Sequence, residues 1–383
     1  MKFLKKYILL IFLIENLLAL SPLIGVSQLL FYAMLAIGLF LMAVGGFFRP
    51  ENFRRCRPLY LLGLVYIFYQ FTLGVDTISV STITYLIAKV ATFVIITVSI
   101  VDDWNLYARK VPFYLSIFIF FILLMGINNV DTLDTTDRQV LGFGNTNATS
   151  ALAALCLATV IFFWNRRYAF FYSIMAIFAL YAMLAAGGRN AMMVLAIMLL
   201  VWTGMSMKRI RIAGAVLCLV WLIISVLPIH LAGIERLEAT ISGEAGTNRD
   251  IERLATQIMI DEKPYTGWGF GAENVGEAAQ LTELGSHNGY LDTIKFMGYP
   301  FGGLWILVLV CSVLPLIKYI KSSDRIIRYH LAIVLSTLAS AFFEAWFVGV
   351  HQVYTNIFFC SLAILTSYKV MQESGQCQEL RCR

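Results

Sequence analysis

The chain has 383 residues, of which 60% are hydrophobic and 14% are charged. A soluble domain of this length needs more polar surface, so the composition indicates a protein that is solvated by lipid. The formal net charge of +6 does not point to nucleic acid, because basic residues that flank membrane helices bind anionic lipid headgroups. The seven cysteines show no CxxC pair and no metal-ligand spacing, so we interpret them as packing residues and expect no cofactor.

Apolar runs recur along the whole chain and predict an all-α, polytopic integral membrane protein, because backbone amides in lipid must pair within helices. Glu15 and Asn16 interrupt the first run, which favours a retained span over a cleaved signal peptide. We expect nine spans in residues 1–229, one large extracytoplasmic helical loop at 230–297, and three spans with a cytoplasmic tail in 298–383. The expected spans, about twelve, are residues 4–20, 24–47, 58–74, 82–100, 112–127, 148–164, 168–186, 190–206, 212–229, 298–317, 329–346 and 353–368.

The distribution of basic residues predicts the orientation of these spans. With the N-terminus in the cytoplasm, 21 Lys and Arg residues lie inside and 7 lie outside, while Lys89 falls within a span. The positive-inside rule therefore places both termini in the cytoplasm of a multi-pass inner-membrane protein. The loop at 230–297, which carries eleven acidic and five basic residues, then lies on the periplasmic face.

The outer loop contains a predicted amphipathic helix. The run Thr247-Asn248-Arg249-Asp250 is a capping box, and apolar residues follow it at helical spacing until Pro264, which should end the helix. Such a helix would lie at the membrane surface with Arg249 and Arg253 one turn apart.

An aromatic and glycine-rich run, Pro264-Tyr265-Thr266-Gly267-Trp268-Gly269-Phe270-Gly271, follows this helix. Its alternating glycines permit tight turns, and the rings between them offer flat faces on which sugars stack. Trp268 is therefore a candidate for substrate binding. Trp268 and Phe270 can equally be aromatic residues of the membrane interface.

The run Ser286-His287-Asn288-Gly289-Tyr290-Leu291 precedes a short amphipathic segment that leads into the tenth span. We expect Ser286 to cap a helix and His287 to lie in its first turn. There the positive end of the helix dipole disfavours imidazolium and keeps a neutral ring that can act as a general base. Taken alone, His287 would more often be an ordinary surface histidine.

Isolated charged residues near or within other spans are further candidates. Arg138 precedes the sixth span and Arg189 lies between two closely coupled spans, so both can reach the same outer face as His287. Either arginine can instead contact lipid headgroups by snorkelling. Lys89 and Glu344 are costly within spans and are candidates for a pair between helices or for a substrate groove.

These motifs follow one another in a recognisable order: Gly188-Arg189 at a span boundary, Asn248-Arg249 at a helix start, Pro264 to Gly271, His287-Asn288, and Met297-Gly298-Tyr299-Pro300-Phe301-Gly302. The series resembles the bacterial O-antigen ligase and O-antigen polymerase superfamily. The hydropathy matches over most of the chain, and the matching residues are concentrated in positions 138–302. No single motif is decisive, but their order, combined with twelve spans and a large outer loop, is fairly specific.

The resemblance implies a metal-independent membrane glycosyltransferase that takes a glycan from undecaprenyl diphosphate on the periplasmic face and transfers it to a sugar hydroxyl of an acceptor glycan. By matching position, His287 would be the base that activates this hydroxyl, and Arg189 and Arg249 would hold the diphosphate. Arg138 matches an early arginine of the family less closely. The other candidates for substrate binding adjoin these positions: Arg253, Trp268, Asn288 and Tyr290.

The chemistry of the side chains agrees with these implied roles. Guanidinium groups bind phosphate oxygens in a bidentate way and stabilise the charge that develops on a diphosphate leaving group. The chain has no DxD triplet, so arginines would do what a divalent cation does elsewhere. The expected partners are the lipid-linked donor, the acceptor glycan and the bilayer, with a chain-length regulator as a further candidate and no nucleic acid.

Several functions stay open at this stage. A repeat-unit polymerase is favoured, because nothing in the sequence specifies the lipid A-core acceptor of an O-antigen ligase. A flippase for lipid-linked sugars would more typically show repeat symmetry and polar groups near the middle of the membrane. A peptidoglycan-type glycosyltransferase is a weaker alternative, because no dominant acidic loop residue stands in the place of His287.

Overall fold

A computed structural model describes residues 2–21, 24–44, 46–127, 139–211, 214, 249–271 and 287–375. These residues form helices and turns and contain no β-strand, which confirms the all-α prediction. The α-helices are α1 (Lys2–Leu18), α2 (Ile24–Ala43), α3 (Pro50–Arg55), α4 (Arg57–Phe71), α5 (Val80–Asp102), α6 (Val111–Met125), α7 (Thr146–Phe162), α8 (Ala169–Ala186), α9 (Arg189–Thr203), α12 (Arg249–Glu262), α14 (Gly289–Val313), α15 (Arg325–Ser340) and α16 (Val353–Glu373). The short η helices are η1 (Val75–Thr77), η2 (Leu106–Lys110), η3 (Arg166–Tyr168) and η4 (Leu314–Lys321).

Most of the expected spans coincide with a helix. The exception is the ninth, at 212–229, of which only Gly214 lies within the described residues. By length and composition, six helical stretches of the described chain can cross a membrane: Gly25–Ala43, Val80–Asp102, Leu106–Met125, Arg166–Ala186, Gly289–Lys321 and Val353–Glu373. The chain is therefore consistent with a multi-pass membrane protein in which at least these stretches supply the apolar surface.

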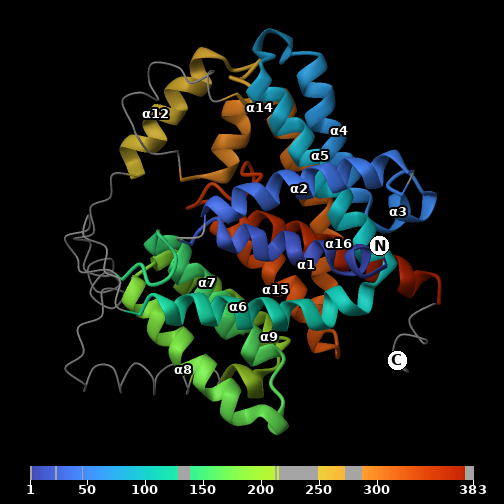
Figure 1. The fold of residues 1–383 in the computed structure, drawn as a ribbon. Coiled ribbons are helices and arrows are strands. Elements are labelled where there is room, and N and C mark those ends of the chain that lie inside the picture. The colour runs from blue at the N-terminus through green and yellow to red at the C-terminus, as the bar shows by residue number, and fades with distance from the viewer. Residues whose placement is uncertain are drawn as a thin grey trace.

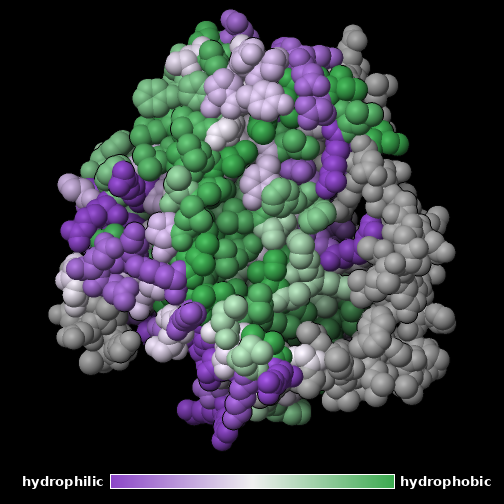
Figure 2. Space-filling view, turned by 180° about the vertical axis from the view of Figure 1, so that it is seen from behind, coloured by the Kyte–Doolittle hydropathy of each residue, from purple (hydrophilic) through white to green (hydrophobic). Residues whose placement is uncertain are grey.

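The helices form a bundle with two distinct ends (Figure 1). The N-terminus, the end of α16 and the short helix α3 lie on one side, which we call the α3 end, and α12 lies on the opposite side, the α12 end. Figure 2 shows a broad band of hydrophobic side chains, with hydrophilic side chains gathered at the left, the bottom and the upper right. This division matches what a bilayer requires of a spanning bundle.

Helix α14 is interrupted in a way that its sequence explains. Gly298 has φ 67° and ψ 171°, and Pro300 follows it, so the helix breaks between Met297 and Tyr299. The segment after α12 packs into this break, because the amide of Tyr299 donates to the carbonyl of Pro264 at 2.7 Å. The short segment before the tenth span that the sequence predicts is thus the first part of α14.

A non-helical segment, residues 341–352, separates α15 from α16. The expected span at 329–346 is therefore too long at its end, since α15 stops at Ser340 and Glu344 lies in the 341–352 segment. Lys89 of α5 holds this segment, and its Nζ donates to the carbonyls of Phe347 at 3.1 Å and Gly349 at 2.9 Å. The buried amino group of Lys89 is thus hydrogen-bonded to backbone carbonyls that lie outside any helix and would otherwise be unpaired among the described residues.

Candidate functional site

His287 lies between two buried carboxylates from distant parts of the chain. Its Nδ1 is 3.4 Å from Oε2 of Glu344, in the 341–352 segment, and its Nε2 is 3.8 Å from Oε2 of Glu252, in α12. The imidazole side chain is 27% exposed, against 10% for Glu344 and 6% for Glu252. The ring is therefore the accessible member of a carboxylate–histidine–carboxylate group.

The helix start beside His287 differs from the one the sequence predicts. Asn288, not Ser286, is the N-cap of α14, and its side chain accepts hydrogen bonds from the amides of Tyr290 at 3.0 Å and Leu291 at 3.1 Å. The prediction that His287 occupies the first turn is wrong, because that residue precedes the cap and has φ 47°. Non-glycine residues adopt such a conformation rarely, and often at functional sites.

The expected electrostatic setting of His287 also needs correction. The sequence pointed only to the helix dipole, whereas the structure also places the carboxylates of Glu252 and Glu344 beside the ring. The two oxygens also restrain the ring from both sides. This arrangement suits a base that must hold a proton after taking it from a hydroxyl group.

Helix α12 carries one of these carboxylates and two of the candidate arginines. It begins at Arg249 and ends at Glu262, before Pro264 as expected. Arg253 lies one turn after Arg249, and its guanidinium donates to the carbonyl of Phe342 at 3.0 Å. The side chain of Arg249 lies outside the described residues. The predicted amphipathic helix is thus present and is attached to the 341–352 segment.

The opposite face of α12 is apolar and points away from the protein. Ile251 is 63% exposed and Leu254 is 62% exposed, while Met259 is buried. These exposed residues lie three positions apart, on one face of the helix. An apolar face of this kind suits a helix that lies on a membrane surface, as the sequence predicts.

The start of α9 brings Arg189 to the same end of the bundle. Arg189 is the first residue of the helix, and the side-chain amide Nδ2 of the next residue, Asn190, donates to Oγ of Ser340 at 2.7 Å. Ser340 ends α15, and the following carbonyl, of Ala341, accepts from the amide of Gly289 at 2.8 Å. The beginnings of α9 and α14 are therefore joined through the end of α15.

Three buried polar atoms around this junction have no hydrogen-bond partner within the described part of the chain. They are Oε2 of Glu252, Nε of Arg253 and Oδ1 of Asn190. Buried polar atoms are rarely left unpaired in a native protein, and those that are often belong to functional sites. Their position beside His287 and Arg189 marks the same region as the sequence motifs.

Other candidates for substrate binding have structural contacts. The indole N–H of Trp268 donates to the carbonyl of Met259 at 2.7 Å, and Nζ of Lys263 lies 4.0 Å from the ring centroid. The hydroxyl of Tyr290 donates to the carbonyl of Leu338 at 2.9 Å. Together with the capping role of Asn288, these contacts give each residue a part in positioning the site. Arg138 lies outside the described residues.

Phe270 is a packing residue rather than a member of an exposed aromatic belt. Its ring stacks on Tyr85 at 4.6 Å and contacts the edges of Tyr66 and Tyr69. The glycine-rich run thus turns into the bundle after Trp268. Gly267 and Gly269 permit this turn, since both have positive φ.

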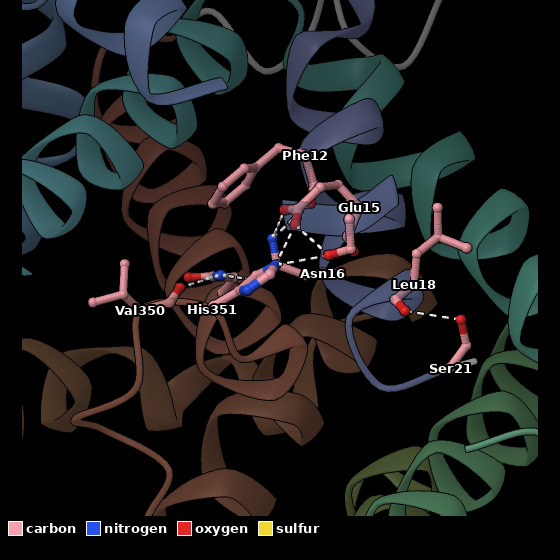
Figure 3. Close-up of polar contacts among 9 residues, drawn as sticks. Phe12, Glu15, Asn16, Leu18, Ser21, Val350 and His351 are labelled. Atoms are coloured by element: carbon pink, nitrogen blue, oxygen red, sulfur yellow. Dashed lines mark hydrogen bonds and ion pairs between the residues drawn. The ribbon is translucent and has the colours of Figure 1, made fainter. Parts of the chain in front are cut away.

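A second histidine–carboxylate pair lies near the junction of the first and last helices (Figure 3). His351 contacts Glu15 of α1 through Nε2, and the carboxylate also accepts hydrogen bonds from Asn16 at 2.8 Å and Ser27 at 2.8 Å. Asn356 of α16 donates to Oδ1 of Asn16 at 2.9 Å. This cluster compensates the burial of a fully enclosed carboxylate.

Sequence reasoning missed Glu252 and His351. Glu252 follows Arg249 by three residues, one turn along the same helix, which was the available signal for a carboxylate beside the arginines. His351 had no comparable signal, because its partner Glu15 is 336 residues away.

Comparison with known protein families finds no match for this chain, and comparison with curated proteins finds none either.

Proposed function

We propose that the protein is a membrane glycosyltransferase that polymerises lipid-linked glycan repeat units, with His287 as the general base. The observation that carries the proposal is the position of His287, just before α14, between Glu252 of α12 and Glu344 of the 341–352 segment. A partly exposed imidazole held by two buried carboxylates is suited to deprotonating a sugar hydroxyl.

The proposed reaction is a single displacement. The acceptor hydroxyl loses its proton to the imidazole of His287, and its oxygen bonds to the anomeric carbon of the donor sugar. The bond from that carbon to the diphosphate oxygen breaks, and undecaprenyl diphosphate leaves. Glu252 and Glu344 stabilise the imidazolium that forms, so proton transfer is not opposed by burial of a positive charge.

Arginines supply the complementary charge for the leaving group in this proposal. Arg189 begins α9, and Arg249 and Arg253 lie one turn apart in α12. We assign Arg189 and Arg249 to the diphosphate, as the family resemblance implies. Arg253 is bound to the carbonyl of Phe342 and is better suited to holding α12 in place. The exposed apolar face of α12 would keep the site at the lipid surface, where the polyprenyl tail remains in the bilayer.

We also propose that the chain crosses the bacterial inner membrane about twelve times, with both termini in the cytoplasm and the site on the periplasmic face. The positions of the helices support this topology, since the shorter apolar helices Thr146–Phe162 and Arg189–Thr203 also lie at expected spans. The N-terminus and the end of α16 share one side of the bundle, opposite α12, as this topology requires (Figure 1).

The test is glycan transfer by the purified full-length protein in detergent with lipid-linked repeat units. His287→Ala should remain folded and lose transfer by roughly 10²- to 10⁴-fold. Tyr265→Phe, an exposed change in the segment after α12, is the matched control and should retain activity. Near-normal transfer by His287→Ala would exclude the assigned base.

Deletion of the gene separates polymerase from ligase. A polymerase mutant should keep single repeat units on its surface glycolipid, because only chain extension is lost. Loss of every repeat unit would instead indicate a ligase that transfers glycan to lipid A-core. Purified protein that moves lipid-linked sugars across vesicles without joining them would indicate a flippase.

A further inference from the structure

A groove of about 660 Å³ opens at the α3 end of the bundle, far from the site around His287. It lies between α4, α14 and the last turns of α16. Its walls are largely apolar and include Leu61, Leu307 and Val308. Three basic side chains, those of Arg54, Arg57 and Lys369, line the same groove, against one acidic side chain, Glu373.

The two arginines are available to an anion. Arg54 and Arg57 are exposed, and neither forms an ion pair with a described residue. Lys369 is 33% exposed and lies 4.0 Å from Glu373, one turn along α16, a weak pair at the protein surface. The rim of the groove therefore has an excess of positive charge.

The position of this basic rim is fixed by a buried neighbour. Nε of Arg55 donates to Oγ of Ser367 in α16 at 2.7 Å, and its Nη1 donates to the carbonyl of Val101 in α5 at 3.2 Å. Arg55 also pairs with Glu51 at 3.2 Å. These bonds attach α3 to the ends of α5 and α16. The position of Arg54, the residue before Arg55, is therefore fixed relative to the bundle.

The apolar walls continue onto helices that are suited to the membrane. Leu307, 57% exposed, lies within the stretch Gly289–Lys321, which is long and apolar enough to span a bilayer. A ligand in this groove would therefore contact hydrocarbon along α4 and α14 and positive charge at Arg54 and Arg57. An amphipathic anion with acyl chains has both properties.

The structure assigns this groove to an anionic phospholipid, with its phosphate at Arg54, Arg57 and Lys369 and an acyl chain along Leu61 and Leu307. The inference goes beyond the proposed function and does not depend on it. The chain after α16, residues 376–383, has two arginines and one glutamate, so its charge does not complement the basic rim. An anionic lipid does.

The experiment measures lipid retained by the full-length protein in native mass spectra after reconstitution with phosphatidylglycerol or phosphatidylcholine. We expect retention of phosphatidylglycerol over phosphatidylcholine, and a loss of roughly tenfold or more in the double variant Arg54→Gln, Arg57→Gln. The control is Arg166→Gln, Arg167→Gln, which removes the same charge from η3, where both side chains are exposed.

Three outcomes would overturn the assignment. Equal retention of both lipids would show that charge does not select the ligand. Equal loss in the two double variants would show general surface attraction rather than a site. Displacement of the lipid by inorganic phosphate alone, at comparable concentration, would show an anion site in which the apolar walls have no part. Glycan transfer measured in the same samples tests the proposed function separately.

Discussion

His287 and Glu344 are 57 residues apart in the chain, yet Nδ1 of the histidine lies 3.4 Å from a carboxylate oxygen of the glutamate. Two features bring them together. The amide of Gly289, two residues after His287, donates to the carbonyl of Glu344 at 3.1 Å, and Lys89 holds the remainder of the 341–352 segment. The carboxylate is therefore placed against the ring by backbone contacts as well as by charge.

The flanking carboxylates should matter for transfer, but less than the base itself. We expect Glu344→Gln and Glu252→Gln each to lower turnover by roughly 10- to 100-fold, because a neutral amide stabilises imidazolium less well. Initial rates of transfer at saturating donor and acceptor measure the effect. Glu262→Gln, an exposed change at the end of α12, is the control. Unchanged rates in both site variants would leave the carboxylates with a structural role only.

Binding of the lipid-linked donor should depend on the guanidinium group of Arg189, so that even replacement by lysine weakens it. Arg189→Ala should raise the KM for the lipid-linked donor by roughly 10- to 100-fold, the value of a charged hydrogen bond, and Arg189→Lys should recover little of it because the planar fork is lost. Arg167→Lys, at the exposed turn η3, provides the comparison. A donor KM that stays constant in the Arg189 variants would favour simple contact with lipid headgroups.

The break in α14 should depend on glycine at position 298. A side-chain carbon there would lie 2.2 Å from the carbonyl oxygen of Tyr265, and φ is +67°. Gly298→Ala should therefore lower the free energy of unfolding by about 1–3 kcal/mol. Gly303→Ala is the matched control, because the space beside Gly303 is open. Thermal unfolding in detergent compares the two, and equal midpoints would contradict the expected strain.

The pair between Glu15 and His351 should stabilise the bundle. His351→Ala leaves a buried carboxylate without its histidine partner and should cost about 3–5 kcal/mol. The double variant Glu15→Gln, His351→Ala should cost less than the sum of the single changes, because the uncompensated charge is gone. The measurement is the unfolding midpoint of four proteins, the unchanged chain, the two single variants and the double variant, which together form a double-mutant cycle. Additive effects would mean that the two side chains do not interact energetically.

Local patterns in the sequence predicted the helices and their ends better than the contacts between them. Apolar runs predicted the positions of most of the long helices, and Pro264 predicted the end of α12, while Thr247 and Asn248 of the capping box lie outside the described residues. The cap at Asn288 was assigned two residues too early, because Ser286 and Asn288 are both good caps and the difference lies in tertiary contacts of Gly289.

The candidate site was only partly predictable for the same reason. His287, Arg189 and Arg249 are predicted from their order along the chain, and their roles stay predictions. Glu344 was expected within a helix, and its pairing with His287 depends on the non-helical segment that Lys89 holds. Polar side chains that pair across long distances in the chain follow no periodic spacing, so such a pair cannot be predicted from a single sequence.

The contact between Glu15 of α1 and His351 of the 341–352 segment also bears on how the protein is made. Glu15 is synthesised 336 residues before His351, so during translation its carboxyl group is present long before that partner exists. Asn16 and Ser27 are synthesised soon after Glu15, and their side chains can donate hydrogen bonds to its carboxylate before His351 is made. A chain that ends before residue 351 would leave the buried carboxylate of Glu15 without its histidine partner.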